Sequence, residues 1–262
     1  MEDKKLRYSV CIDAVFRSSD RSFVQAMHEV AALGYDAFEF WSWQDKDLGE
    51  IRRASRDTGL QTAAFCTVMR NPGDRTQQEA YLEGVKQSVE AAQSLDCLAL
   101  IMQAGWEYET AAKGIARQEH RRVLTETLCR AGELAAAGGV TLLLEPLNLR
   151  VDHPGYHLWS SEDAFDLLDK VGNPHVKLLF DIYHQQVTEG DLTSHILPNI
   201  DKIGHFHAAA VPGRGEPTDG EINYRYLFRR IAESGYGGFV GLEYMTQDEP
   251  SESLRRVWEV CW

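Results

Sequence analysis

Short apolar runs alternate with amphipathic segments along the whole chain, and this alternation limits the fold more than any other feature of the sequence. Eight strand-like runs occur, and each is followed by a segment whose apolar residues have helical spacing. The predicted strands are residues 7–13, 37–43, 61–67, 96–103, 141–145, 176–181, 203–207 and 239–243. Strands that alternate with helices are typical of a parallel sheet.

The helical segments have recognisable starts and stops, such as a serine and aspartate cap at residues 160–163 and glycines at 34, 59 and 138–139. The predicted helices are residues 20–34, 48–57, about 76–94, 117–137, a helix from the cap at 160–163, 192–199, 224–233 and 252–262. Eight such units without a linker or repeat predict one domain, residues 1–262, folded as a single (β/α)8 TIM barrel of the α/β class. An open doubly wound sheet is the alternative, but no GxGxxG motif follows the first strand.

Four of the predicted strands end on a side chain that can bind a cation. Glu145, Asp181 and Glu243 end the fifth, sixth and eighth strands, and His207 ends the seventh. In a parallel barrel all strands end at one mouth, where barrel enzymes keep their active sites. Converging carboxylates repel one another unless a cation or a shared proton compensates. The sequence therefore predicts one divalent cation between these four residues, with separate helix caps and salt bridges as the alternative.

Composition limits the partners and the compartment. A net charge of −13 argues against nucleic acids and anionic membranes, which attract basic proteins. Neither a membrane-spanning run nor the apolar core of a signal peptide is present. The five cysteines have no CxxC spacing, so we expect reduced thiols in a cytoplasmic protein. Whether the chain forms a homo-oligomer is left open.

Several motifs resemble one known family. Residues 144–148 are Leu-Glu-Pro-Leu-Asn, residues 152–158 are Asp-His-Pro-Gly-Tyr-His-Leu, and residues 180–184 are Phe-Asp-Ile-Tyr-His. A longer loop, residues 212–224, carries Pro-Gly-Arg-Gly-Glu-Pro and then Gly-Glu-Ile-Asn-Tyr. Together they resemble the hydroxypyruvate isomerase family within the xylose-isomerase-like TIM barrels, which also hold the ketose 3-epimerases. The resemblance is detailed over residues 142–244 and general before them.

The resemblance implies an isomerase that moves a proton through an enediolate, with Glu145 and Glu243 as proton donor and acceptor. In the metal-dependent relatives the same two positions, with Asp181 and His207, look like the cation ligands. Three carboxylates and one imidazole suit Mn²⁺ or Mg²⁺, and Co²⁺ also fits such a set. We therefore expect one divalent cation that assists the two glutamates.

Candidate substrate contacts come partly from the resemblance and partly from strand ends. His184 and Arg214 match positions that would contact substrate oxygens. Trp106, with Trp41 and Trp43, is a candidate sugar-stacking wall, although large aromatic residues also occur in cores and interfaces. The predicted substrate-binding residues are His184, Arg214, His205, Gln103 and Trp106.

Two departures from the family bear on the substrate. His207 stands where similar hydroxypyruvate isomerases tend to carry glutamine. A histidine at this position is more like the epimerases. Met245 stands where lysine is common, which removes a cation that could hold a substrate carboxylate. We expect a neutral, unphosphorylated keto sugar or a short hydroxy-carbonyl compound, and an isomerase ahead of a metal-dependent ketose 3-epimerase. An endonuclease-IV-like metal hydrolase is a remote alternative, because such sites need more ligands at strands two to four.

Overall fold

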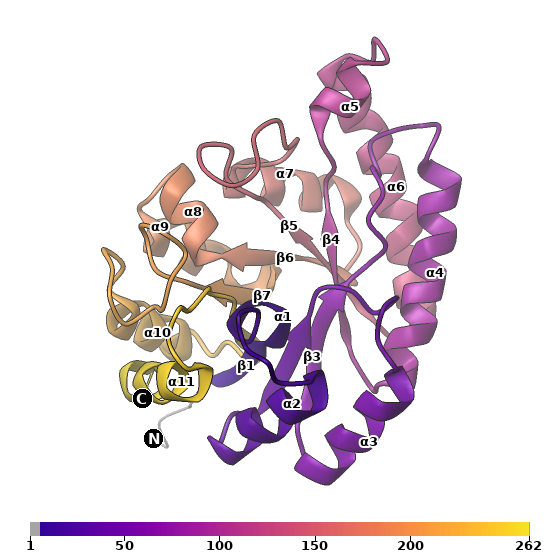
Figure 1. Cartoon of the computed structure of the whole chain (residues 1–262). Helices are drawn as coiled ribbons and strands as arrows, with labels where there is room; N and C mark the ends of the chain where they lie inside the picture. The colour runs from indigo at the N-terminus through magenta and orange to yellow at the C-terminus, as the bar shows by residue number, and fades with distance from the viewer. Residues whose placement is uncertain (1–5, 262) are drawn as a thin grey trace.

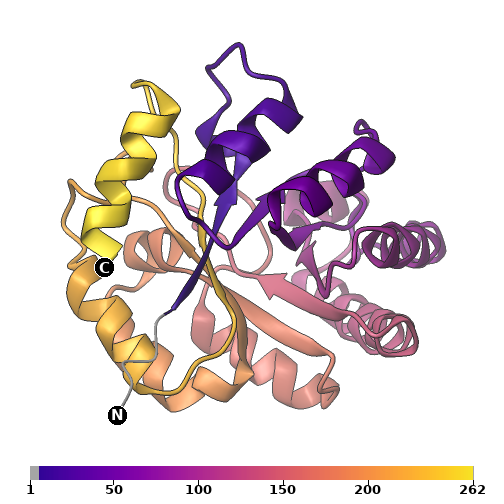
Figure 2. The same ribbon diagram turned by 90° about the horizontal axis from the view of Figure 1, so that it is seen from below.

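The strands form a closed parallel barrel in the order β1 to β8, which confirms the predicted (β/α)8 fold (Figure 1). The computed structural model describes residues 6–261. Seen from below, the helices surround the strands (Figure 2). The strands are β1 (Arg7–Cys11), β2 (Ala37–Phe40), β3 (Gln61–Cys66), β4 (Ala99–Gln103), β5 (Thr141–Glu145), β6 (Val176–Asp181), β7 (Ile203–Ala208) and β8 (Phe239–Leu242).

Long helices cover the outside of the barrel, and short ones occupy the connections. The longer helices are α2 (Phe23–Ala32), α3 (Leu48–Thr58), α4 (Gln78–Ser94), α6 (Arg117–Gly138), α7 (Ser161–Val171), α10 (Tyr224–Glu233) and α11 (Pro250–Cys261). The short elements are α1 (Ile12–Val15), α5 (Glu107–Ala111), α8 (Ile182–Thr188), α9 (Leu192–Ile196) and the 3₁₀ helix η1 (Leu197–Lys202).

Local sequence explains where several helices begin and end. Ser22 and Gln25 form a capping box at the start of α2, and the Asp47 side chain accepts a hydrogen bond from the backbone at the start of α3. Gly59 and Gly139 end α3 and α6 in the left-handed region, with φ of 77° and 71°. Glycine adopts this conformation without steric cost, so each helix stops where the sequence predicts.

The strand pattern places two of the predicted ligands inside the barrel. Leu143 and Leu179 belong to a small apolar cluster that is separate from the main core beneath the helices. Successive side chains on a strand point to opposite faces, so residues two apart share a face. Glu145 and Asp181 therefore point inward, at the mouth where β5 and β6 end.

Four strands end earlier than predicted, β1 at Cys11, β2 at Phe40, β3 at Cys66 and β8 at Leu242. At the end of β2 a side chain replaces the strand pairing. The backbone N–H of Trp41 donates to Asp13 Oδ2 at 2.8 Å, just past the end of β2. Asp13 itself lies in α1, which follows β1 directly. β8 also ends at Leu242, so Glu243 is the first residue beyond the strand.

Four helical segments differ from the prediction, and one of them is α1, which includes residues 12 and 13 of the predicted first strand. Residues 107–119, expected as a loop and a helix start, contain the short helix α5. The segment 192–199 is split between α9 and η1, which has a proline in its first turn. α8, which was not predicted, begins directly after β6. Trp262, the predicted end of the last helix, lies outside the described residues.

Two predictions from composition can be compared with the described residues. Cys11, Cys66 and Cys97 are buried free thiols, and Cys129 is a half-buried one, as expected for reduced cysteines. Over residues 6–261, no helix combines the length and apolarity that crossing a bilayer requires.

A buried aspartate ties the β3–α4 loop together and provides a stability prediction. Asp74 accepts hydrogen bonds from the backbone and hydroxyl of Thr76, from Gln77 and from Lys113, and its side chain is fully buried. Burial opposes ionisation of Asp74, but Lys113 and the other donors outweigh it and hold the carboxyl pKa well below its usual range.

We expect Asp74→Ala to lower the free energy of unfolding by about 1–3 kcal/mol at pH 7, the scale of losing hydrogen bonds to a charged group. Because the folded-state pKa of Asp74 is depressed, its contribution is complete above the unfolded pKa of about 4 and declines as the pH falls further. Urea unfolding of both proteins at pH 7 and pH 3.5 measures this. A difference that stays constant or grows toward low pH would contradict the assignment.

Candidate active site

The four predicted ligands meet at the C-terminal mouth of the barrel. Glu145, Asp181, His207 and Glu243 each offer one ligand atom, and these atoms all lie within 4.8 Å of one another. All four side chains are buried. Adjacent strands thus bring together residues that are up to 98 positions apart in the sequence.

His207 lies between the two glutamates. Its Nδ1 atom is 3.5 Å from Glu145 Oε1 and 3.3 Å from Glu243 Oε2, and it has no hydrogen-bond partner among the described residues. Its Nε2 atom faces the opposite way, 3.4 Å from Glu39 Oε2. One imidazole nitrogen therefore points at the same place as the carboxylate oxygens.

Glu243 is fixed through both of its oxygens. The indole N–H of Trp41 donates to Oε1 at 2.6 Å, and the guanidinium of Arg214 donates to Oε2 at 2.6 Å. Burial acts against ionisation, but Arg214 and His207 outweigh it and hold the pKa of Glu243 well below its usual range. Glu243 is thus an oriented carboxylate that is ionised at neutral pH.

The electrostatics of the cluster fit a cation. Burial, with the nearby Glu243 and Asp181, raises the pKa of Glu145 to about 7, against the opposing effect of His207. Burial also raises the pKa of Asp181. Burial lowers the pKa of His207, but Glu39 and Glu243 outweigh it and raise that pKa well above its usual value. The carboxylates therefore attract positive charge, and a divalent cation would keep Glu145 and Asp181 ionised.

Arg214 reaches the cluster from a tight loop between β7 and α10. Its backbone is in the left-handed region, with φ of 54°, and Gly213 before it has φ of 91°. The loop is tied to the β8 end, because the Met245 N–H donates to the Arg214 carbonyl at 2.9 Å. The guanidinium also lies over the Tyr183 ring, 5.4 Å from its centroid. This geometry aims Arg214 at Glu243 and Asp181 and not at solvent.

A cavity of about 360 Å³ opens above the cluster, within the roughly 300–1,000 Å³ of small-molecule sites. Gln103 and Arg214, two of the predicted substrate-binding residues, line it, and the Gln103 Oε1 atom has no hydrogen-bond partner among the described residues. Trp41 and Trp43 from the predicted aromatic wall also line this cavity, as does His153. The mouth is therefore part polar and part aromatic.

His184 is near the cluster but not on the cavity wall. Its side chain is fully buried, its Nδ1 atom accepts a hydrogen bond from the Asn148 amide at 2.7 Å, and its Nε2 atom is 3.5 Å from Asp181 Oδ2. His153, whose ring centroid is 5.3 Å from that of His184, lines the cavity in its place. The histidine that faces the opening is thus His153, which the sequence analysis quoted only as part of a motif.

Trp106 and His205 lie elsewhere than the prediction placed them. After β4 the chain turns at Gly105, with φ of 84°, and the Trp106 ring packs edge-on against Tyr156 beside a separate depression. His205 shares the inward face of β7 with His207, but it lies two residues deeper in the barrel. The structure does not bring either residue to the cavity above Glu145.

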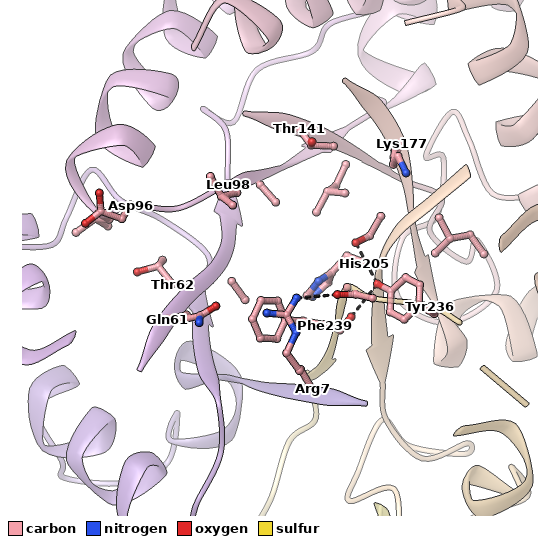
Figure 3. Close-up of a pocket in the computed structure, with 18 of the residues that line it drawn as sticks. Arg7, Gln61, Thr62, Asp96, Leu98, Thr141, Lys177, His205, Tyr236 and Phe239 are labelled. Carbon is pink, nitrogen blue, oxygen red and sulfur yellow. Dashed lines mark hydrogen bonds between the residues drawn. The ribbon is translucent and has the colours of Figure 1, made fainter. Parts of the chain in front are cut away.

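His205 lines a second, larger cavity at the opposite end of the barrel. This cavity of about 900 Å³ is formed by the beginnings of the strands, including Arg7, Gln61 and Phe239. Figure 3 shows His205 close to Arg7, Tyr236 and Phe239 at this opening. It does not contain the acidic cluster, and barrel enzymes carry their chemistry at the C-terminal mouth, so the smaller cavity is the candidate site.

Comparison with known proteins identifies the family. The model of the xylose isomerase-like TIM barrel family matches residues 27–259, which include every strand from β2 to β8. This chain belongs to the xylose isomerase-like TIM barrel family.

Two isomerases and one solved structure are similar to this xylose isomerase-like barrel over nearly its whole length. Hydroxypyruvate isomerase of Escherichia coli is 33% identical over 261 residues, which cover 95% of this chain and 97% of the relative. A 2-oxo-tetronate isomerase of Cupriavidus necator is 33% identical over 247 residues, covering 90% and 92%. A solved structure described as AP endonuclease, family 2 from Brucella melitensis is 28% identical with a TM-score of 0.88, covering 95% and 96%.

One residue of this xylose isomerase-like barrel that contacts the cluster was missed by the sequence analysis. Glu39 on β2 is 1% exposed and contacts both His205 and His207. Burial acts against its ionisation, but His207 and His205 outweigh burial and lower the pKa of Glu39 to about 2. The available signal was a glutamate inside an otherwise apolar strand, Ala-Phe-Glu-Phe.

Proposed function

We propose that the protein is a divalent-cation-dependent isomerase of hydroxy-carbonyl compounds, similar in reaction to the hydroxypyruvate isomerases. One observation carries this proposal: Glu145 and Glu243 approach the same His207 nitrogen from two strand ends, at the floor of an open cavity. Moving a carbonyl along a carbon chain needs removal of one proton and return of another, and two facing carboxylates suit that task. The names of the two isomerase relatives support the reaction class.

We assign Glu145, Asp181, His207 and Glu243 as the residues that hold the cation. The unpartnered His207 Nδ1 atom and the carboxylate oxygens around it form a set that suits Mn²⁺, Mg²⁺ or Co²⁺. When bound, such a cation polarises the substrate carbonyl and stabilises the negative charge of an enediolate.

The proton is moved by the two glutamates in this proposal. Trp41 and Arg214 hold Glu243 ionised and in one orientation, so Glu243 is ready to accept a proton from the carbon next to the carbonyl. Glu145 faces it from β5, accepts the proton of the substrate hydroxyl and passes that proton to the neighbouring carbon, while Glu243 gives the proton that it removed to the carbonyl oxygen. In the reverse direction the two carboxylates exchange roles.

The cavity wall orients the substrate. The amide of Gln103 and the ring of His153 are placed to bind substrate oxygens. Burial and the nearby Arg214 lower the pKa of His153, so its ring is neutral at pH 7 and can both donate and accept. Trp41 and Trp43 provide an apolar wall for the carbon skeleton.

A ketose 3-epimerase is the second candidate. His207 completes an epimerase-like ligand set, and the thioether of Met245 lines the cavity where a lysine would bind an acid group. The same two glutamates would then invert one carbon without moving the carbonyl. We rank the isomerase first, because the loop of residues 212–224 resembles the hydroxypyruvate isomerases over many residues. The resemblance to the epimerases rests on the single ligand His207.

The substrate prediction is tested with a panel of unphosphorylated ketoses, aldoses and hydroxypyruvate, followed by NMR with Mn²⁺ and with EDTA. We expect isomerisation of a short hydroxy-carbonyl compound to be fastest. Met245→Lys should raise turnover of hydroxypyruvate severalfold over the wild type, because it adds a cation to the cavity wall, while Met245→Gln serves as a polar control without charge. An unchanged rate in Met245→Lys, with faster C3 epimerisation of a ketohexose by the wild type, would reverse the ranking.

We also propose that the enzyme works in the cytoplasm as one domain, residues 1–262. The buried free thiols of Cys11, Cys66 and Cys97 support a reducing compartment. The acidic charge of −13 supports a small-molecule substrate over a nucleic acid.

A further inference from the structure

A buried carboxylate inside the barrel contacts the histidine of the candidate cation site from behind. Glu39 Oε2 is 2.9 Å from the Nε2 atom of His205 and 3.4 Å from the Nε2 atom of His207. All three side chains are at most 3% exposed. Both imidazole N–H groups therefore point at the same carboxylate oxygen.

The barrel leaves room for this contact at one glycine. Glu39 is on β2 and His207 is on β7, so the Glu39 side chain reaches its partner across β1 and β8. Gly241 on β8 pairs with His207, and a Cβ atom at that position would lie 2.0 Å from Glu39 Oε1 and 2.7 Å from His207 Cδ2. Any other residue at 241 would displace the glutamate or the imidazole.

The contact decides which nitrogen of His207 faces the mouth. An N–H group at Nε2 that donates to Glu39 leaves Nδ1 directed at Glu145 and Glu243. Histidines that bind metals commonly donate their other N–H to a carboxylate, which fixes the ring orientation and makes the ligating nitrogen a stronger base. An isolated buried carboxylate is costly, and an apolar side chain would fill the same space more cheaply.

We propose that Glu39 is a positioning residue of the cation site, which orients His207 so that Nδ1 binds the cation, and that Gly241 provides the space for it. This inference rests on the proposed cation dependence. Glu39 does not touch the substrate cavity, whose lining includes His207 but not Glu39. His205 contacts the same carboxylate oxygen of Glu39 and lines the second cavity.

The test is Mn²⁺ binding to the full-length protein, measured by calorimetry after removal of metal. The wild type should bind one Mn²⁺ per chain, and Glu39→Gln should weaken binding about ten- to a hundredfold, the range found for residues that support metal ligands. Glu189→Gln makes the same chemical change at a glutamate that accepts hydrogen bonds from Ser160 and Ser161, away from the cluster, and should bind normally. Thermal unfolding without metal shows whether each variant is folded.

A second variant keeps the test decisive if Glu39→Gln does not fold. Gly241→Ala leaves the carboxylate in the chain but removes its space, and it should also weaken Mn²⁺ binding by tenfold or more. Wild-type affinity in a folded Glu39→Gln or Gly241→Ala protein would overturn the positioning role. Two Mn²⁺ per wild-type chain would also overturn it, because Glu39, His205 and His207 would then be ligands of their own site. A wild type that binds no cation would instead refute the proposed function itself, and this inference with it.

Discussion

Glu145→Gln and Glu243→Gln should each lower turnover by about a hundredfold or more, the scale of losing a positioned general acid or base. The carboxamide keeps the shape of the side chain, but it cannot accept a proton from carbon. At Glu243 the amide oxygen can still accept a hydrogen bond from Trp41 or Arg214, so the fold around it should persist. Turnover of the preferred substrate, with thermal unfolding as a check, measures the effect.

Isotope exchange adds a second readout of the same chemistry. In deuterated water the wild-type product should carry deuterium at the carbon that receives the proton, because Glu145 delivers a proton from a substrate hydroxyl that exchanges with the solvent, and not the proton that Glu243 removed. Glu189→Gln, an acid-to-amide change outside the site, should retain wild-type turnover. Near-normal activity in either active-site variant would remove that glutamate from the mechanism.

EDTA should reduce wild-type activity to background, and added Mn²⁺ should restore it. Three converging carboxylates need compensating charge, and the carbonyl needs a Lewis acid. Asp181→Asn tests the same site in the chain itself. Asp181 also accepts a hydrogen bond from the His184 backbone at the start of α8, and asparagine caps helices about as well as aspartate. A loss of metal in this variant would therefore reflect the ligand and not the helix.

Metal analysis of protein purified without chelator, before and after the substitution, checks this prediction. We expect close to one cation per wild-type chain and far less in Asp181→Asn. Full occupancy in the variant would remove Asp181 from the ligand set. Undiminished turnover in EDTA would argue for an isomerase that uses only its glutamates, Arg214 and His207.

The fold and the core of the site could be predicted because both follow from local sequence. Apolar runs with a polar last residue identify the strand ends, and a parallel barrel places all strand ends at one mouth. The grouping of Glu145, Asp181 and His207 depends only on this rule. Arg214 was predicted from the resemblance of the loop at residues 212–224, and its guanidinium reaches Glu243.

Predictions failed where the decisive contact lies across the barrel or in a loop turn. His205 and His207 have the same pattern in the sequence, yet two residues along an inward face separate the active-site mouth from the other end. Trp106 is turned away by a single positive φ at Gly105. The sequence around Glu39 does not indicate its contact with His207, because β2 and β7 are neither adjacent in sequence nor paired in the barrel.

The hydrogen-bonded closure of β1 onto β8 has a consequence for folding. The proposed ligands come from β5 to β8 and the loop after β8, but Glu39 and Trp41, which orient them, come from the first third of the chain. We therefore expect a cation to bind the closed barrel more tightly than an open one, so that its binding stabilises the closure of β1 onto β8. At a free cation concentration of 100 times Kd, cation binding would stabilise the closed barrel by about 2.7 kcal/mol. Fragments that lack the first two strands should not gain this stabilisation.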